Sequence, residues 1–263
     1  VGLSEEGNYI ASDIPALLAH TRRIIQLADH EVVRLTKEKA EVFDRAGNLL
    51  DKKELLVDWD VSSAEKGGYD HFMIKEIMEQ PQALSATISP RIDSNGGIIL
   101  DGITLTGKEL KRLNRLYIVA CGSAYHAGVV GKYVLEKLTR IPVEVDLASE
   151  FRYRNPILED GGMVVVISQS GETADTLAAL RESKKRGFKV LGIVNVVGSS
   201  IAREADYVFY TWAGPEIAVA TTKAYSAQLA AVYLLAIHFG RVRGNLDDGT
   251  YQGMIEELLL LPD

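Results

Sequence analysis

Three hydroxyl side chains and a glycine lie within six residues in the middle of the chain. They are Ser168, Ser170, Gly171 and Thr173, and an apolar run ending at Ile167 comes directly before them. Glycine permits a tight turn, and a helix that begins behind it offers free backbone N–H groups, so the segment favours an anion. The turn contains no lysine or arginine, which suits a sugar phosphate better than a magnesium-bound nucleotide. Serine and threonine also cap helices without binding anything, so this turn by itself leaves both interpretations open.

Two further turns are candidates for contact with the same ligand. Cys121-Gly-Ser-Ala-Tyr125 follows a predicted strand, and Ala218-Val-Ala-Thr-Thr-Lys223 leads into a long apolar helix. Because parallel strands end at the same edge of a sheet, all three turns are expected on one rim. A lysine in the first turn of a helix, such as Lys223, is more typical of a solvated or paired side chain than of a phosphate ligand.

The other chemistry-bearing residues give weaker signals. Glu150 and Glu216 lie near predicted strand ends, but nothing in the sequence pairs them as an acid and a base. Cys121 is the only cysteine, which excludes an internal disulfide, and it is more typical of a small residue closing a turn than of an activated nucleophile. The five histidines are scattered without ligand spacing, so no structural metal is expected. Neither a Gly-x-Gly-x-x-Gly nor a Walker A motif is present.

The elements that must position these turns alternate between strands and helices from about Tyr69 onward. Short apolar runs rich in β-branched residues are typical of parallel strands covered on both faces, and the alternation predicts a doubly wound α/β sheet. The predicted strands cover residues 116–120, 143–147, 164–168, 190–194 and 207–211. The predicted helices cover residues 72–80, ended by Pro81, and 108–114, 125–138, 174–186, 200–204 and about 223–239.

Residues 8–59 show a different pattern. A helix is predicted at 14–21, and alternating stretches at 31–36 and 40–44, the second of which leads into a turn at 45–48, predict antiparallel strands. This segment would form a poor domain by itself. Residues 60–68 are small and polar, as is typical of an interdomain linker.

Composition excludes several classes of function. The chain has 263 residues, of which 47% are hydrophobic and 25% charged, and a net charge of −7. Such a charge provides no basic surface for nucleic acid or for an anionic membrane. No apolar run reaches the length of a membrane span, and the first residues lack the pattern of a signal peptide, so a cytoplasmic location is expected.

Several stretches, taken in order, resemble the glutamine:fructose-6-phosphate amidotransferase (glucosamine-6-phosphate synthase) family. Its first sugar-isomerase (SIS) domain is resembled by residues 121–123, 148–152, 168–176 and 216–225, and the end and junction of its glutaminase domain by residues 8–17 and 75–81. The resemblance implies a small α+β remnant of an N-terminal-nucleophile glutaminase domain at 1–60 and a linker at 61–75. It further implies a five-stranded SIS domain at 76–241, and at 242–263 the start of a connection to a second SIS domain.

The resemblance also implies a function. The family makes glucosamine 6-phosphate from fructose 6-phosphate and glutamine, the first step of hexosamine biosynthesis, with no metal or organic cofactor. One of these sugar phosphates is the implied ligand, and the implied partner is a second copy of the chain bound through the isomerase part, with no nucleic acid or membrane. By motif, the phosphate falls to Ser168, Gln169, Ser170 and Thr173, and the sugar lies near Ser123, Val219 and Thr221.

The chain departs from the family pattern in two ways. The family often has Thr-Ser after Cys-Gly, where this chain has Ser123-Ala124, and Thr221 stands in place of a frequent serine. The family's nucleophilic cysteine, its Schiff-base lysine and its second SIS domain have no counterparts here. The chain is therefore expected to be a fragment that binds sugar phosphate, holds no catalytic residue and is inactive alone.

Two alternatives belong to other classes of function. A non-catalytic SIS sensor or regulator would carry a helix-turn-helix and a basic face upstream of the sheet, where this sequence predicts strands in an acidic chain. A stand-alone sugar-phosphate isomerase would encode a catalytic carboxylate and histidine within one SIS chain, and no such pair is evident.

Overall fold

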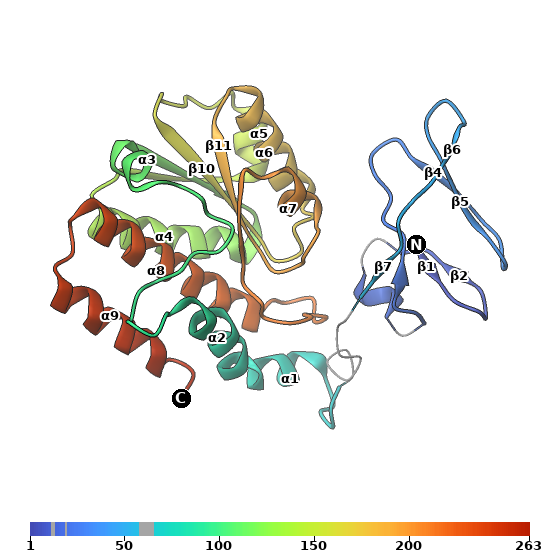
Figure 1. The fold of residues 1–263 in the computed structure, drawn as a ribbon, viewed down its shortest axis with the longest axis horizontal. Coiled ribbons are helices and arrows are strands. Elements are labelled where there is room, and N and C mark those ends of the chain that lie inside the picture. Colours follow the sequence, from blue (N-terminus) through green and yellow to red (C-terminus); the bar gives the residue numbers. More distant parts are fainter. Residues whose placement is uncertain (12–13, 19, 58–65) are drawn as a thin grey trace. The chain divides into compact units, whose positions relative to one another are not determined.

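The computed structural model describes residues 1–11, 14–18, 20–57 and 66–263. These residues form two compact units, Val1–Lys75 and Glu76–Asp263 (Figure 1). The three candidate turns all belong to the second unit.

The second unit is built on a five-stranded parallel sheet. Its strands are β8 (Arg115–Ala120), β9 (Val143–Leu147), β10 (Gly162–Ser168), β11 (Lys189–Val194) and β12 (Tyr207–Tyr210). They lie in the order β12-β11-β10-β8-β9, and each neighbouring pair is parallel. The predicted strands and the doubly wound α/β class are confirmed.

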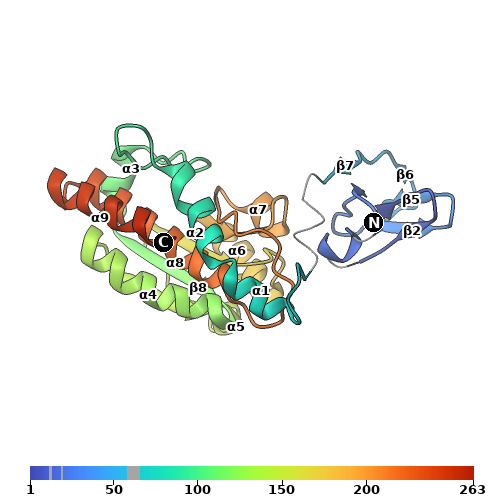
Figure 2. The same cartoon turned by 90° about the horizontal axis from the view of Figure 1, so that it is seen from below.

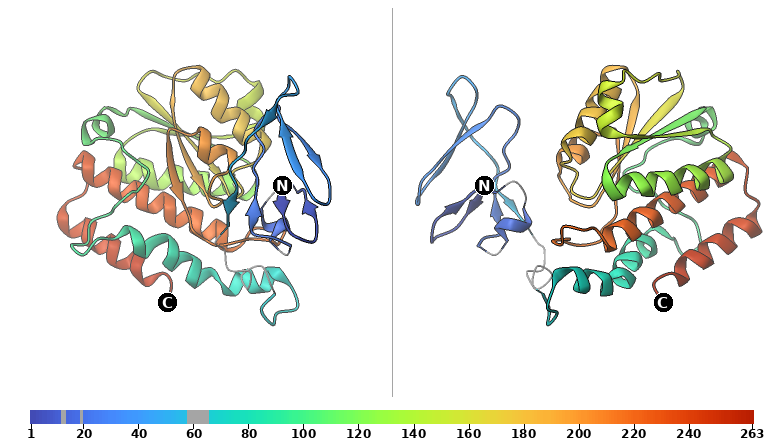
Figure 3. Two further views of the ribbon diagram at one scale, coloured as in Figure 1. Left: turned by 45° about the vertical axis from the view of Figure 1, so that its right-hand side comes forward. Right: turned by 180° about the vertical axis from the view of Figure 1, so that it is seen from behind.

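Helices cover both faces of this sheet (Figures 1 and 2). One face carries α2 (Gln80–Ile88), α3 (Gly107–Arg112), α4 (Gly122–Thr139), α8 (Lys223–Arg243) and α9 (Asp248–Leu260), and the other carries α5 (Ala148–Tyr153), α6 (Ala174–Lys185) and α7 (Ser200–Glu204). Side chains alternate between the two faces along each strand: Leu116 and Ile118 join the core under α4 and α8, whereas Tyr117 and Val119 join the core under α5 and α6. Figure 3 shows α4 and α8 running side by side.

Pro81 has a different role from the one predicted. The helix that begins at Phe72 is α1 (Phe72–Met78), and α2 starts at Gln80 with Pro81 in its first turn. Proline fits there because the first N–H groups of a helix have no partner within it, so the missing donor is not lost from the ladder. Pro81 therefore lies within a second helix instead of only ending the first, and this helix continues into η3 (Ser89–Arg91).

The first unit consists of short antiparallel strands. β1 (Gly2–Leu3), β2 (Asn8–Tyr9), β3 (Arg23–Ile24) and β7 (Leu55–Leu56) form one sheet, and β4 (Val32–Leu35), β5 (Ala40–Phe43) and β6 (Leu49–Leu50) form another. The strands predicted at 31–36 and 40–44 are thus confirmed. The helix predicted at 14–21 is wrong: the described residues there form only the 3-10 turn η1 (Pro15–Leu17), because so short a segment before a strand offers few bonds to offset helix nucleation. Most of the linker expected at 60–68 lies outside the described residues.

A histidine on α8 predicts how the stability of the second unit responds to pH. Burial lowers the pKa of His238 from its ordinary value of 6.5, and a hydrogen bond with the backbone of Ile98 opposes this effect only in part. Because the unfolded chain binds a proton more readily, His238 lowers stability as the pH falls below about 6.5 and has no such effect above that range. We expect His238→Gln to flatten the pH dependence of urea unfolding between about pH 7.5 and 5. Identical slopes for the variant and the parent chain would contradict this.

Candidate functional site

The strand order reverses between β8 and β10, and the candidate site lies there. From β8 the chain passes through α4 to β9 on one side, and from β10 it passes through α6 to β11 on the other. Because α4 and α6 cover opposite faces of the sheet, the two turns diverge at this point. Ligands of open parallel sheets bind at such a reversal, beyond the carboxyl ends of the strands. Ala120 pairs with Ile167, so Cys121 and Ser168 are the next residues at adjacent strand ends.

The turn after β10 is held by its own hydroxyls. The buried Ser168 Oγ accepts a hydrogen bond from Gly171 N at 3.0 Å and lies 2.9 Å from Thr173 Oγ1. Gly171 has a φ of +67°, which a glycine adopts without strain. A Cβ at this position would collide with Ser199 Oγ, so no other residue fits without movement. Ser168 therefore shapes the turn from inside it.

The other two hydroxyls of this turn are left able to donate. Ser170 Oγ accepts from Glu172 N at 3.2 Å, which leaves its own proton free for a ligand. When Ser168 donates to Thr173, the hydroxyl of Thr173 likewise retains its proton for an acceptor. Thr173 is the N-cap residue of α6 but makes no side-chain capping bond. The first amides of α6 and two hydroxyl donors thus lie together, an arrangement that suits a phosphate.

An acidic residue, Glu172, lies inside the candidate anion-binding turn and needs an explanation. The Glu172 carboxylate accepts a hydrogen bond from Ser200 N at 2.7 Å, in the first turn of α7. Ile201 N bonds to Gly171 O at 3.0 Å, so α7 supports the turn through its backbone as well. The Glu172 carboxylate therefore binds an amide at the start of α7 and not at the start of α6.

The turn after β8 presents one of the predicted residues. Cys121 is a partly buried free thiol at the N-cap of α4, and Ser123 is exposed in the first turn of that helix. Ala124 packs against the core between α4 and the sheet. The side chain at position 124 therefore packs against the core, and this is the position at which the chain has alanine where the resembled family often has serine.

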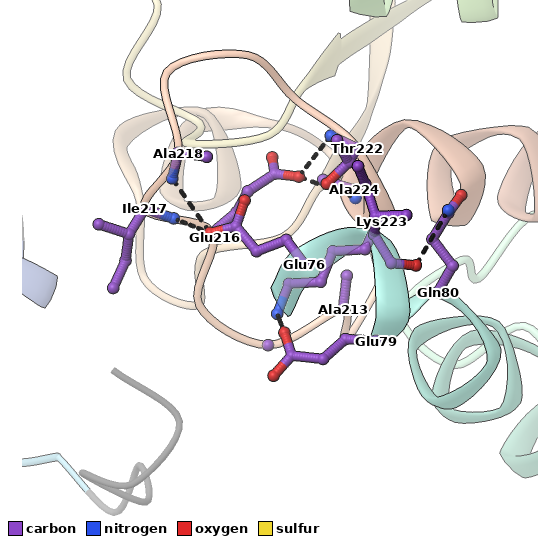
Figure 4. A network of polar contacts seen from close by, with 12 residues as sticks. Glu76, Glu79, Gln80, Ala213, Glu216, Ile217, Ala218, Thr222, Lys223 and Ala224 are labelled. Atoms are coloured by element: carbon purple, nitrogen blue, oxygen red, sulfur yellow. Dashed lines mark hydrogen bonds and ion pairs between the residues drawn. The ribbon is translucent and has the colours of Figure 1, made fainter. Parts of the chain in front are cut away.

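The third segment, residues 211–222, follows β12 and is fastened to its neighbours by side chains (Figure 4). Asn195 connects it to the turn after β10: Asn195 N bonds to Gln169 O at 3.1 Å, while Asn195 Oδ1 accepts from Ala213 N at 2.8 Å and Nδ2 donates to Gly214 O at 2.7 Å. The turn at 168–173 and the segment at 211–222 are therefore joined through one buried residue, which uses its backbone amide for the turn and its side chain for the segment.

The start of α8 is already occupied by a carboxylate of the chain. Glu216 Oε1 accepts from Thr222 N at 2.8 Å and from Ala224 N at 3.2 Å, and Glu216 Oε2 accepts from Thr221 Oγ1 at 2.6 Å. Because Thr221 donates its proton to Glu216, its hydroxyl can only accept from a ligand. Val219 is fully exposed. The start of α8 therefore holds Glu216, whereas the start of α6 has no side-chain cap.

Of the two alternatives predicted for Lys223, a solvated or a paired side chain, the structure shows the paired one. Its ammonium donates to Glu79 Oε2 at 2.6 Å, and the residue is 3% exposed. Glu150 is exposed on α5. Sequence reasoning missed Glu76, Glu79 and Asn195; the first two stand three residues apart in the 75–81 stretch, a helical spacing that would have been the signal.

The described residues also bear on other classes of site. No three His, Cys, Asp or Glu side chains come together there in a way that would hold a metal ion. Likewise, in the described part of the chain, none of the helices has the length and apolarity needed to cross a membrane. The described residues before position 58 form strands and one 3-10 turn, so they contain no helix-turn-helix of the kind expected for a regulator.

Comparison with known proteins places these features in a family. Residues 109–238 match the family model described as SIS domain. Over its whole length the chain is 56% identical to the glutamine--fructose-6-phosphate aminotransferase [isomerizing] of Clostridium tetani and 55% identical to that of Caldanaerobacter subterraneus, and it spans 43% of the length of each. A solved C-terminal domain of glucosamine-fructose-6-phosphate aminotransferase from Francisella tularensis superposes with a TM-score of 0.71 at 43% identity, over 75% of this chain and 55% of that one.

The matched residues coincide with the site. The span 109–238 contains all five strands, the three turns and the first part of α8. Residues 109–238 therefore have the fold of a SIS domain, and along its full length the chain is similar to glutamine--fructose-6-phosphate aminotransferases.

Proposed function

We propose that the second unit binds the phosphorylated hexose of an enzyme that converts fructose 6-phosphate and glutamine to glucosamine 6-phosphate and glutamate. The observation that carries this proposal is the turn after β10, where the hydroxyls of Ser170 and Thr173 lie beside the uncapped start of α6. The names of the similar proteins support the choice of ligand.

In this proposal the phosphate and the sugar are held by different segments. The Ser170 and Thr173 hydroxyls, the Gln169 side chain and the amides of α6 bind the phosphate, and Ser168 holds the turn in the shape that exposes them. The sugar lies toward Ser123, Val219 and Thr221. Since Thr221 donates to Glu216, it accepts a hydrogen bond from a sugar hydroxyl.

We propose three further properties from the sequence and its resemblance. A homodimer formed through the isomerase part and glucosamine 6-phosphate as the second ligand rest on the resemblance to the aminotransferases, and a cytoplasmic location rests on the sequence pattern. The SIS match supports a sugar phosphate as the class of ligand.

Removing both donor hydroxyls tests the phosphate site. We expect Ser170→Ala/Thr173→Ala to weaken fructose 6-phosphate binding by at least roughly a hundredfold, because two bonds to a charged group contribute about 1.5 to 3 kcal/mol each. Titration calorimetry on the parent chain and the variant measures this. The matched control is Ser85→Ala/Ser89→Ala, which removes two hydroxyls that lie 3.4 Å apart on α2 and η3, outside the three turns. Equal affinity in the site variant and this control would refute the assignment.

A further inference from the structure

Two glutamates that precede the sheet by many residues hold both ends of the segment that carries Val219 and Thr221 (Figure 4). Glu76 Oε1 accepts hydrogen bonds from Ile217 N at 2.6 Å and from Ala218 N at 3.0 Å. Glu79 Oε2 accepts from Lys223 Nζ at 2.6 Å. Residues 219–222 lie between these anchors, and α1 and the start of α2 supply both carboxylates.

Burial of the Glu76 carboxylate costs free energy that its packing in the core does not explain. The residue is 2% exposed, and its Oε2 finds no hydrogen-bond partner among the described residues. A buried carboxylate with an unpaired oxygen is less stable than an apolar side chain of similar size, so a core requirement does not explain it. The Oε1 atom gives this glutamate its one visible role, which is to fix two consecutive backbone amides.

Those amides lie directly before the proposed sugar contacts. The bonds from Ile217 N and Ala218 N to Glu76 fix the backbone directly before Val219. The ion pair of Lys223 with Glu79 fixes the chain directly after Thr222. Between them, Glu216 fixes the Thr221 hydroxyl. A segment without regular secondary structure is thus held in one conformation by three carboxylates.

We infer that Glu76 is a positioning residue for sugar recognition: with Glu79 it clamps residues 217–223 in the conformation that meets the hexose. The inference rests on the proposed function, because it assumes that the sugar lies against this segment. It assigns no part in phosphate binding to Glu76, since the turn at 168–173 is held by Ser168, Asn195 and α7. Loss of the clamp should therefore change recognition of the sugar and leave recognition of the phosphate unchanged.

The test compares two probes, fructose 6-phosphate and inorganic phosphate, on the 263-residue chain. Glu76→Ala is expected to weaken fructose 6-phosphate binding about tenfold, because the binding-competent conformation of the segment becomes a minor one, while phosphate affinity stays within about twofold. Glu76→Gln keeps an acceptor oxygen and should restore most of the affinity for the sugar phosphate. The matched control is Glu136→Ala, which removes a carboxylate that accepts from Val143 N at 2.9 Å at the opposite edge of the sheet.

Amide hydrogen exchange provides a readout that does not depend on a ligand. Exchange at Ile217 and Ala218 should accelerate in Glu76→Ala, and exchange at Gly171 and Glu172 should not. If Glu76→Ala does not fold, Glu76→Asp takes its place in the binding and exchange measurements. Its shorter side chain keeps the charge but cannot reach both amides, so the same changes are expected. Unchanged fructose 6-phosphate affinity, or a parallel loss of phosphate affinity, would overturn the inference. Failure of the parent chain to bind either probe would instead count against the proposed function, while the exchange result would still test the clamp.

Discussion

Gly171→Ala is expected to destabilise the second unit by about 3 kcal/mol and to abolish sugar-phosphate binding. Two effects combine. An alanine at a φ of +67° is strained by about 1 to 2 kcal/mol, and its Cβ would collide with Ser199 Oγ and lie 2.6 Å from Ser199 Cβ, which forces the turn away from α7. Urea unfolding measures the first quantity and calorimetry with fructose 6-phosphate the second.

A second glycine separates strain from collision. Gly187 has a φ of +84°, and a Cβ there would meet nothing within 4 Å, so Gly187→Ala reports the backbone term alone. The collision term is relieved by Gly171→Ala/Ser199→Gly, which removes the atoms that a new Cβ would strike. We expect this double variant to recover stability to about the level of Gly187→Ala. Equal destabilisation by the two single variants would contradict the collision.

Arg91→Ala is expected to destabilise the second unit by about 3 kcal/mol. The Arg91 guanidinium is buried; it donates to Thr87 O at 2.6 Å and to Tyr210 O, and it lies 4.0 Å from the centre of the Phe209 ring. Its removal leaves two carbonyl oxygens without this donor, where bonds to a charged group contribute about 1.5 to 3 kcal/mol each. Relief of charge burial offsets part of the loss, since burial lowers the pKa of Arg91 to about 10.

Substitutions at the same position rank the contributions. Arg91→Met keeps an apolar contact with Phe209 but donates nothing, and Arg91→Lys keeps the charge without the planar fork that reaches both carbonyls. Unfolding free energies should therefore fall in the order parent, lysine, methionine, alanine. The exposed Arg112 on α3 is a control, because Arg112→Ala removes the same side chain from the surface and should change stability by less than about 0.5 kcal/mol. A loss at Arg91 no larger than at Arg112 would contradict the role.

The sheet could be predicted from the sequence because its signals are local. The run Met163–Ile167 is apolar without alternation, as a strand covered on both faces must be, and it is buried under helices on both sides. The turn behind it could be recognised for the same reason, since Gly171 N and Thr173 Oγ1 both hydrogen-bond to Ser168 Oγ within six residues. A local motif predicts a local geometry.

Short helices and proline positions were harder to predict. The six-residue α5 has too few residues to show a helical period. The start of α9 is marked by an Asp247 cap, whose Oδ1 accepts from Thr250 N at 2.9 Å, and a single aspartate is a weak signal in the sequence. Pro81 favours both the end of one helix and the first turn of the next, and the sequence does not distinguish them. Packing of α2 against α8 decides in favour of the second helix.

By itself, the sequence determined the sheet, the hydroxyl-rich turn at 168–173 and the family resemblance, because each is encoded by residues close together along the chain. Only the tertiary structure decided what holds residues 217–223. Glu76 reaches Ile217 across a separation of 141 residues, and Glu79 reaches Lys223 across 144. The helical spacing of Glu76 and Glu79 marks two carboxylates in the sequence, but it carries no signal for their partners, because a loop amide or a lysine at a helix start is ordinary in sequence. Burial then makes these few contacts decisive, because a polar group removed from water must find its partner wherever the fold brings one.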